Sequence, residues 1–166
     1  MEWKGKVFGG CEGRESEHPL EKVVLVMDVV ENVKLVVAVT GGREFTDVES
    51  VELRFTQLLL RTGLQAHEVM VIDGMARGAD EICHRVAVRF GFITGRFPAD
   101  WKKDGRSAGF RRNEMMADCL VALDKQVGVI ACPGGRGTTH MVSYSLSVGL
   151  LVSDLNGKQI KELVPA

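Results

Sequence analysis

The chain lacks the features that define several large classes of proteins. Its four cysteines form no CxxC pair, no His/Cys cluster has zinc-site spacing, and neither a GxSxG nor an EF-hand pattern occurs. No apolar run approaches the ~20 residues that cross a bilayer, and the N-terminus lacks the apolar core of a secretory signal. A formal net charge of −1 argues against coating nucleic acid by bulk electrostatics. We therefore expect no metal site, no membrane contact and a reducing, cytoplasmic location.

The remaining composition is that of one ordinary globular domain. The 166 residues are 45% hydrophobic and 26% charged, which is enough for a packed core without disulfides. Cys83, Cys119 and Cys132 lie in apolar segments, where buried free thiols are expected. We divide the chain into an N-terminal extension, residues 1–33, and a main domain, residues 34–166. The extension is expected to be an irregular arm followed by a possible extra strand at 22–30.

Short apolar strands alternate with helices along the main domain. Strands are expected at residues 34–39, 69–72, 92–97, 127–132 and 150–152. Helices are expected from Thr46 or Asp47 to Gly63, with Glu49 in a capping box, and then at 79–90, 113–123 and 141–148. The alternation predicts an α/β fold: a single Rossmann-like, doubly wound, mainly parallel sheet with helices on both faces. The polar segment 98–112 is expected to be a loop, and the tail from Asp154 to be peripheral.

A glycine-rich run between the strand at 127–132 and the helix at 141–148 carries the strongest functional signal. It reads Pro133, Gly134, Gly135, Arg136, Gly137, Thr138, Thr139. Strand, glycine turn and helix together direct backbone N–H groups and a helix N-terminus at an anion. Glycines let the backbone approach a ligand closely, and the arginine and threonines add donors for phosphate oxygens. The pattern is neither a Walker A motif nor a GxGxxG fingerprint.

Glycines, arginines or basic residues also follow the other core strands. Because ligands of parallel α/β sheets bind beyond the carboxyl ends of the strands, we expect these residues to share one binding site. They are Gly41, Gly42, Arg43, Gly74, Arg77, Gly78, Asp80, Asp100, Trp101, Arg111, Arg112 and Asn113. Structural alternatives exist for each kind: tight turns for the glycines, ion pairs for the arginines, a helix-terminus charge for Asp80 and a loop anchor for Trp101.

Five motifs in order resemble those of YspA-like proteins, which are small members of the SLOG superfamily, related to DprA/Smf and the LOG enzymes. They are TGGR at 40–43, GMARGAD at 74–80, FPADW at 97–101, RRN at 111–113 and PGGRGT at 133–138. The resemblance covers roughly residues 34–153. It implies a Rossmann-like domain that binds a nucleotide or nucleotide-derived ligand through its phosphates, often as a sensor or a module of bacterial conflict and phage-related systems. It also implies a homo-oligomer, since LOG-like domains commonly pair.

One departure from the LOG pattern bears on catalysis. LOG enzymes are similar to PGGxGTxxE, whose glutamate helps to cleave the base from a nucleoside monophosphate, and here Met141 stands at that position. We therefore expect a non-catalytic binder or sensor with no certain cofactor. The alternative is a LOG-like hydrolase of an N-glycosidic or phosphate bond, using Glu114, Asp80 or His140. A DprA-like accessory that binds single-stranded DNA along the basic residues 102–112 is the less favoured third interpretation.

Overall fold

The computed structural model describes residues 31–161, which form a six-stranded sheet in the order β3-β2-β1-β4-β5-β6. The strands from β3 to β5 pair in parallel, and β6 pairs antiparallel with β5. Their bounds are Leu35–Thr40 for β1, Val69–Asp73 for β2, Ile93–Arg96 for β3, Gln126–Ala131 for β4, Val152–Asp154 for β5 and Gln159–Ile160 for β6. The chain winds outward in both directions from β1 and β4, as a doubly wound sheet does.

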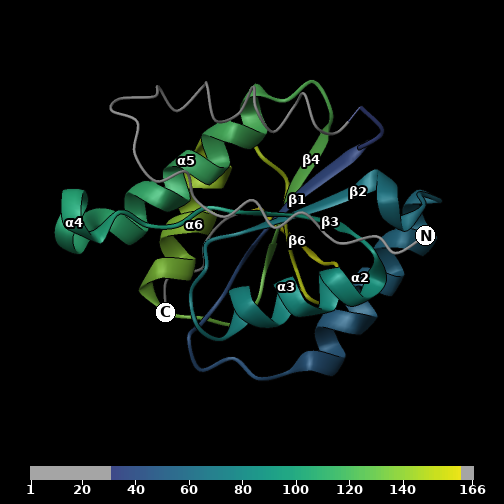
Figure 1. The fold of residues 1–166 in the computed structure, drawn as a ribbon, viewed down its shortest axis with the longest axis horizontal. Helices are drawn as coiled ribbons and strands as arrows, with labels where there is room; N and C mark the ends of the chain where they lie inside the picture. Colours follow the sequence, from purple (N-terminus) through teal and green to yellow (C-terminus); the bar gives the residue numbers. More distant parts are fainter. Residues whose placement is uncertain (1–30, 162–166) are drawn as a thin grey trace, which may run out of the picture.

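Helices cover both faces of the sheet (Figure 1). Their bounds are Val48–Thr62 for α2, Ala79–Phe90 for α3, Trp101–Asp104 for α4, Ala108–Ala122 for α5 and Arg136–Ser147 for α6, with short 3-10 helices η1 at Ala66–Glu68 and η2 at Gly105–Ser107. Helices α2 and α3 lie on one side of the sheet, and α5 and α6 on the other (Figure 1). The predicted fold class is therefore confirmed. Within residues 31–161, no helix has the length and apolar character needed to span a bilayer.

The central strands are buried on both faces, as their unbroken apolar runs predict. All six residues of β1 are buried. Val36 and Ala38 face the layer of α5 and α6, whereas Val37 and Val39 face α2 and α3, so that two apolar clusters hold the sheet between the layers. Burial of apolar surface on this scale is the main stabilising term of such a domain. The sheet is consequently a firm base for the loops that leave its carboxyl edge.

Several element boundaries differ from those expected. The N-cap of α2 is Asp47, whose carboxylate accepts the Ser50 N–H at 3.0 Å, so Glu49 completes no capping box there. Segment 98–112 is partly helical: α4 and η2 precede α5, which begins at Ala108, five residues before the expected start. Helix α6 begins at Arg136 instead of residue 141, and β5 occupies 152–154 instead of 150–152. The tail beyond Asp154 contributes β6. The arm and extra strand expected within residues 1–30 lie outside the described residues.

Candidate functional site

The loops after β1 and β4 meet at the carboxyl edge, where the winding of the sheet changes direction. Cys132 N–H donates to the Thr40 carbonyl at 2.8 Å, and Gly42 N–H donates to the Pro133 carbonyl at 2.9 Å. These two bonds continue the pairing of β1 with β4 for one step beyond the strands. In an open α/β sheet this switch point is where ligands bind.

Three glycines are required because the loops pack backbone against backbone. A Cβ at Gly134 would collide with the Thr138 hydroxyl and lie 2.6 Å from the Gly42 nitrogen. A Cβ at Gly41 would lie 2.7 Å from that of Cys132. Gly78, at φ +78°, would place a Cβ 2.5 Å from the Arg43 carbonyl oxygen, in a conformation that favours glycine in any case. Together with Gly42, whose N–H donates to the Pro133 carbonyl, these three join the loops after β1, β2 and β4 into one unit, which we call the glycine interlock (Gly41, Gly42, Gly78 and Gly134).

The other two glycines of the central run face open space. Nothing lies within 4 Å of a Cβ built at Gly135 or Gly137. Gly135 is the N-cap of α6, so no side chain caps the helix, and its first turn contains no acidic residue. By contrast, α2 has the Asp47 cap and α3 has two acidic residues in its first turn. The N-terminal N–H groups and positive dipole end of α6 are therefore left for an external acceptor.

Thr138 adds an unsatisfied hydroxyl at the same helix end. The residue is 8% exposed, and its Oγ1 is buried without a hydrogen-bond partner among the described residues. The hydroxyl lies beside Gly134, at the base of the open helix end. Because buried hydroxyls in native proteins are nearly always paired, this atom, one of five buried side-chain polar atoms without a partner within residues 31–161, indicates a hydrogen-bonding group from outside those residues.

A chain of hydrogen bonds ties the loop after β2 to both α5 and α6. The Arg112 guanidinium donates to the Gly74 carbonyl, and its Nε donates to the Asn113 side-chain oxygen at 2.9 Å. Asn113 in turn donates through Nδ2 to the Gly137 carbonyl at 3.0 Å. Arg112 and Asn113 were expected to contact the ligand. In the structure both hold the walls of the site in place, and direct ligand contact by them stays a prediction.

Asp80 is a buried carboxyl in the same network. Its Oδ2 accepts the Gly74 and Ala76 N–H groups at 3.1 and 3.2 Å and lies 3.8 Å from Arg112. Burial raises the pKa of Asp80 to about 6, outweighing the opposite effects of Arg112 and the backbone donors, while the charge of Asp73 raises it further. Asp80, the last residue of GMARGAD, thus stabilises the turn formed by the residues before it.

Sequence reasoning missed a second polar cluster at the ends of β2 and β3. The fully buried Asp73 accepts the Met75 N–H at 2.8 Å and contacts His84 Nδ1 at 3.0 Å and Arg96 Nε at 3.3 Å. Met75 has a left-handed φ of 59°, which is strained for a side-chain-bearing residue. An aspartate that ends an apolar strand was the available signal, but its partners are 11 and 23 residues further along the chain.

Some expected site residues lie in local ion pairs or caps. Arg77 pairs with Glu44 at 3.0 Å and Arg111 with Asp104 at 3.2 Å, and both arginine side chains are more than half exposed. Asp100 caps α4 by accepting the Lys103 N–H at 3.0 Å. Trp101 is 55% exposed on α4, which projects from the outer end of α5 (Figure 1).

The three proposed acid–base groups are engaged with neighbouring side chains or backbone. His140 Nε2 lies 3.4 Å from Glu114 Oε1, and its ring stacks on Phe110 at a centroid distance of 4.5 Å. Asp80 is bound as described above. Met141, at the position of the LOG glutamate, is 0% exposed and packs in the core beneath α6. The position of the LOG glutamate is therefore occupied by a core side chain.

The buried cysteines form no metal site with neighbouring groups. Cys83, Cys119 and Cys132 are free and buried, and the Sγ atoms of Cys83 and Cys132 lie 3.9 Å apart. Burial and the neighbouring thiol hold the pKa of Cys83 well above its ordinary value, so it stays a thiol at neutral pH. Within residues 31–161, no three His, Cys, Asp or Glu side chains gather closely enough to hold a metal ion.

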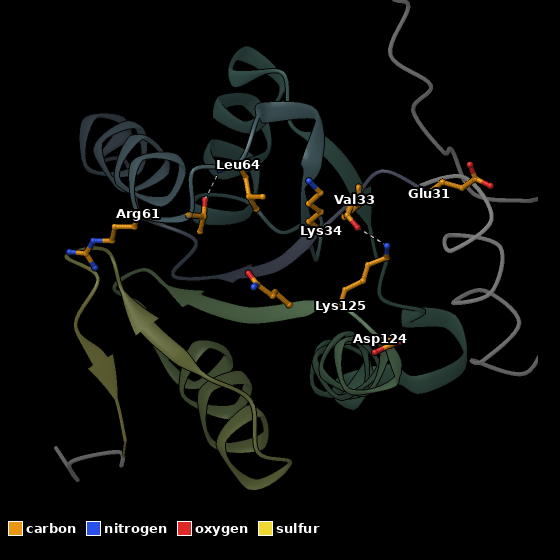
Figure 2. Close-up of a pocket in the computed structure, with 9 residues that line it drawn as sticks. Glu31, Val33, Lys34, Arg61, Leu64, Asp124 and Lys125 are labelled. Atoms are coloured by element: carbon orange, nitrogen blue, oxygen red, sulfur yellow. Dashed lines mark hydrogen bonds between the residues drawn. The ribbon is translucent and has the colours of Figure 1, made fainter.

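A cavity of about 730 Å³ lies at the opposite, amino edge of the sheet (Figure 2). Lys125 donates to the Val33 carbonyl at 2.6 Å there, and Lys34 pairs with Glu68 at 2.5 Å. The lining residues are Glu31, Val33, Lys34, Arg61, Thr62, Leu64, Asp124, Lys125 and Gln126. The lining contains three basic and two acidic residues, and the cavity is separated from the glycine interlock by the length of the strands.

The strand order, with its change of direction between β1 and β4, defines a Rossmann-like α/β protein. Residues 35–103 match the model of YAcAr, the YspA, cpYpsA-related SLOG family. This match confirms the resemblance to YspA-like SLOG proteins and contains three of the five motifs, while RRN and PGGRGT lie beyond it.

A solved structure with a known name carries a similar fold. The X-ray structure of DNA processing protein A (DprA) from Streptococcus pneumoniae superposes with a TM-score of 0.56 at 19% identity, covering 77% of this chain and 52% of that chain. The chain thus spans about half the length of DprA, and at this identity the likeness concerns the fold alone. No curated protein matches the chain.

Proposed function

We propose that the protein binds a nucleotide or nucleotide-derived ligand, with a phosphate at the N-terminus of α6. The observation that carries this proposal is the uncapped helix end with the buried, unpartnered Thr138 hydroxyl beside it. The match to a SLOG family and the position at the switch point support it.

Phosphate is the group that best satisfies this arrangement. Its oxygens accept several hydrogen bonds at once, and its charge is stabilised at the positive end of a helix dipole. The open faces of Gly135 and Gly137 leave room for close approach, and Arg136 begins the helix. A neutral ligand group would leave the dipole uncompensated, so an anion is favoured.

Binding without bond cleavage fits the surrounding side chains better than hydrolysis. The LOG glutamate position is filled by the buried Met141, and the remaining candidates contact each other or the backbone. We therefore assign the role of a binder or sensor. A hydrolase is the alternative, and His140→Gln would abolish its turnover if the Glu114–His140 pair acts as general base.

The test is calorimetric titration with AMP and inorganic phosphate, with adenosine as the ligand that lacks a phosphate. Wild type should bind AMP and phosphate but not adenosine, and AMP should be recovered intact on chromatography. Gly135→Asp should abolish binding because its carboxylate would lie against the phosphate. Ser143→Asp adds the same charge at an exposed position of the same helix and should bind normally. Equal binding by both variants would contradict the assigned position.

Single-stranded nucleic acid is a second candidate, favoured by one observation. The projecting α4–η2 segment contains the half-exposed Trp101 and, within five residues of it, the exposed Lys102, Lys103 and Arg106. Cations beside an exposed aromatic ring are the elements of a single-strand platform. This function predicts oligonucleotide binding that weakens steeply with salt and is lost in Trp101→Ala, whereas Gly135→Asp would leave it unchanged.

A further inference from the structure

Arg43 leaves the loop after β1 beside the start of α6. The residue before it, Gly42, donates its N–H to the Pro133 carbonyl at 2.9 Å. A Cβ on Gly42 would lie only 3.1 Å from the Gly134 Cα, so the two loops are in backbone contact. The next residue on one loop is Arg43 and on the other is Gly135, the N-cap of α6. Arg43 and the helix end therefore lie next to each other on the carboxyl edge of the sheet.

Within residues 31–161, the arginines of the predicted site differ in whether a carboxylate pairs with them. Arg77, Arg111 and Arg112 each have a carboxylate within ion-pair distance. Over residues 31–161, neither Arg43 nor Arg136 has one. Glu44, the acidic residue next to Arg43 in the sequence, is taken by Arg77.

Arg43 is also close enough to Arg112 for their charges to interact. Burial is the main cause that lowers the pKa of Arg112, the charges of Asp80 and Asp73 oppose it, and the charge of Arg43 lowers the pKa further. Holding two like charges together costs free energy unless an anion lies between or beside them. Arg112 already pairs with Asp80, whereas Arg43 has no carboxylate partner within residues 31–161, so Arg43 is the charge of this pair that an added anion would neutralise.

We propose that the surface between Arg43 and the N-terminus of α6 binds a ligand with two adjacent phosphates, a nucleoside diphosphate or a nucleotide-derived pyrophosphate. One phosphate lies at the N-terminus of α6 and the other is read by Arg43. This inference rests on the proposed nucleotide-binding function and adds to it the phosphate count and the residue that selects it. Arginine suits the task because its planar fork binds phosphate oxygens in pairs.

The experiment compares the dissociation constants of AMP and ADP, without divalent cations, for wild type and two variants. Arg43→Gln removes the proposed reader, and its exposed position should leave the fold intact, which a thermal melt checks. Arg85→Gln removes the same charge from an exposed position on α3, outside the set of residues that we place in the site. No ion pair within the described residues is lost there.

Wild type and Arg85→Gln should bind ADP ~10-fold or more tightly than AMP, as one charge-assisted contact allows. In Arg43→Gln the ratio should fall to about one while AMP affinity changes less than ~3-fold. Equal affinity of wild type for AMP and ADP, or a preserved ratio in Arg43→Gln, would overturn this inference and leave the proposed function standing. Absence of binding by AMP, ADP and inorganic phosphate would instead overturn the proposed function itself.

Discussion

Replacing Gly134 or Gly137 with alanine separates the structural glycines from the open ones within a single turn. At Gly134 the added methyl group would collide with the Thr138 hydroxyl and lie 2.6 Å from the Gly42 nitrogen and 2.9 Å from the Gly41 carbonyl carbon. Overpacking typically costs 1–3 kcal/mol, and here the fixed backbone partners place the cost near the upper end. About 3 kcal/mol corresponds to a loss of ~6–12 °C in melting temperature for a chain of this size.

Gly137→Ala should have the opposite effect. Nothing lies within 4 Å of a Cβ there, and the residue is in the first turn of α6. Alanine is favoured over glycine in a helix by up to ~1 kcal/mol, so the variant should melt at the same or a slightly higher temperature. Thermal melts followed by circular dichroism measure both variants.

A double variant tests which contact is responsible. Thr138→Ala removes the hydroxyl but not the backbone of Gly41 and Gly42, so it should not rescue Gly134→Ala. Full rescue would show that the hydroxyl alone sets the cost. Gly134→Ala with wild-type stability would refute the glycine interlock altogether.

Three further predictions concern buried groups. Burial raises the folded-state pKa of Asp80 from 3.8 to about 6, so the folded protein holds a proton that the unfolded chain has released between those values. The stabilisation by this proton is complete below pH 3.8 and is lost as the pH rises through about 6. Relative to Asp80→Asn, the unfolding free energy of wild type should therefore fall by up to about 3 kcal/mol over this range. Urea unfolding measures it, and a difference between the two proteins that does not change with pH would contradict the prediction. Met141→Glu should destabilise the protein by more than ~4 kcal/mol by burying a charge, whereas Met141→Leu should cost under ~1.5 kcal/mol; near-wild-type urea unfolding of the glutamate variant would place residue 141 outside the core. In a Cys11→Ser background the three buried thiols should react with a disulfide reagent only on unfolding, and a fast phase in the native protein would show that one of them is accessible.

The sheet and the edge at which its glycine turns gather could be predicted because their signals are local. The apolar run of β1 indicates burial on both faces, and strand–helix alternation determines the parallel order and hence the edge where Gly41, Gly74 and Gly134 gather. The sequence predicts a loop at 98–112 because the segment is polar and contains Gly105 and Gly109, so that nothing in it indicates the short α4 and η2. Those helices are held by the Asp100 cap and by contact with α5, not by an apolar stripe.

The roles of individual site residues could not be predicted in the same way. A glycine that packs against another loop and a glycine that faces open space look alike in a sequence, and only contacts separate Gly134 from Gly135. Similarly, Arg112 and Arg43 both follow from their motifs, but the partner of Arg112 is the Gly74 carbonyl, 38 residues away. Long-range pairing of this kind depends on the completed fold.

The glycine interlock limits how this site can be redesigned. Because the loops after β1, β2 and β4 touch through their backbones, lengthening one of them would displace the other two, and a loop transplanted from another protein would meet the same obstacle. New ligand preferences are therefore expected to arise from side chains on the open rim, above all at positions 43 and 136. A library that varies those two positions and keeps the four interlocking glycines would explore specificity without sacrificing the fold.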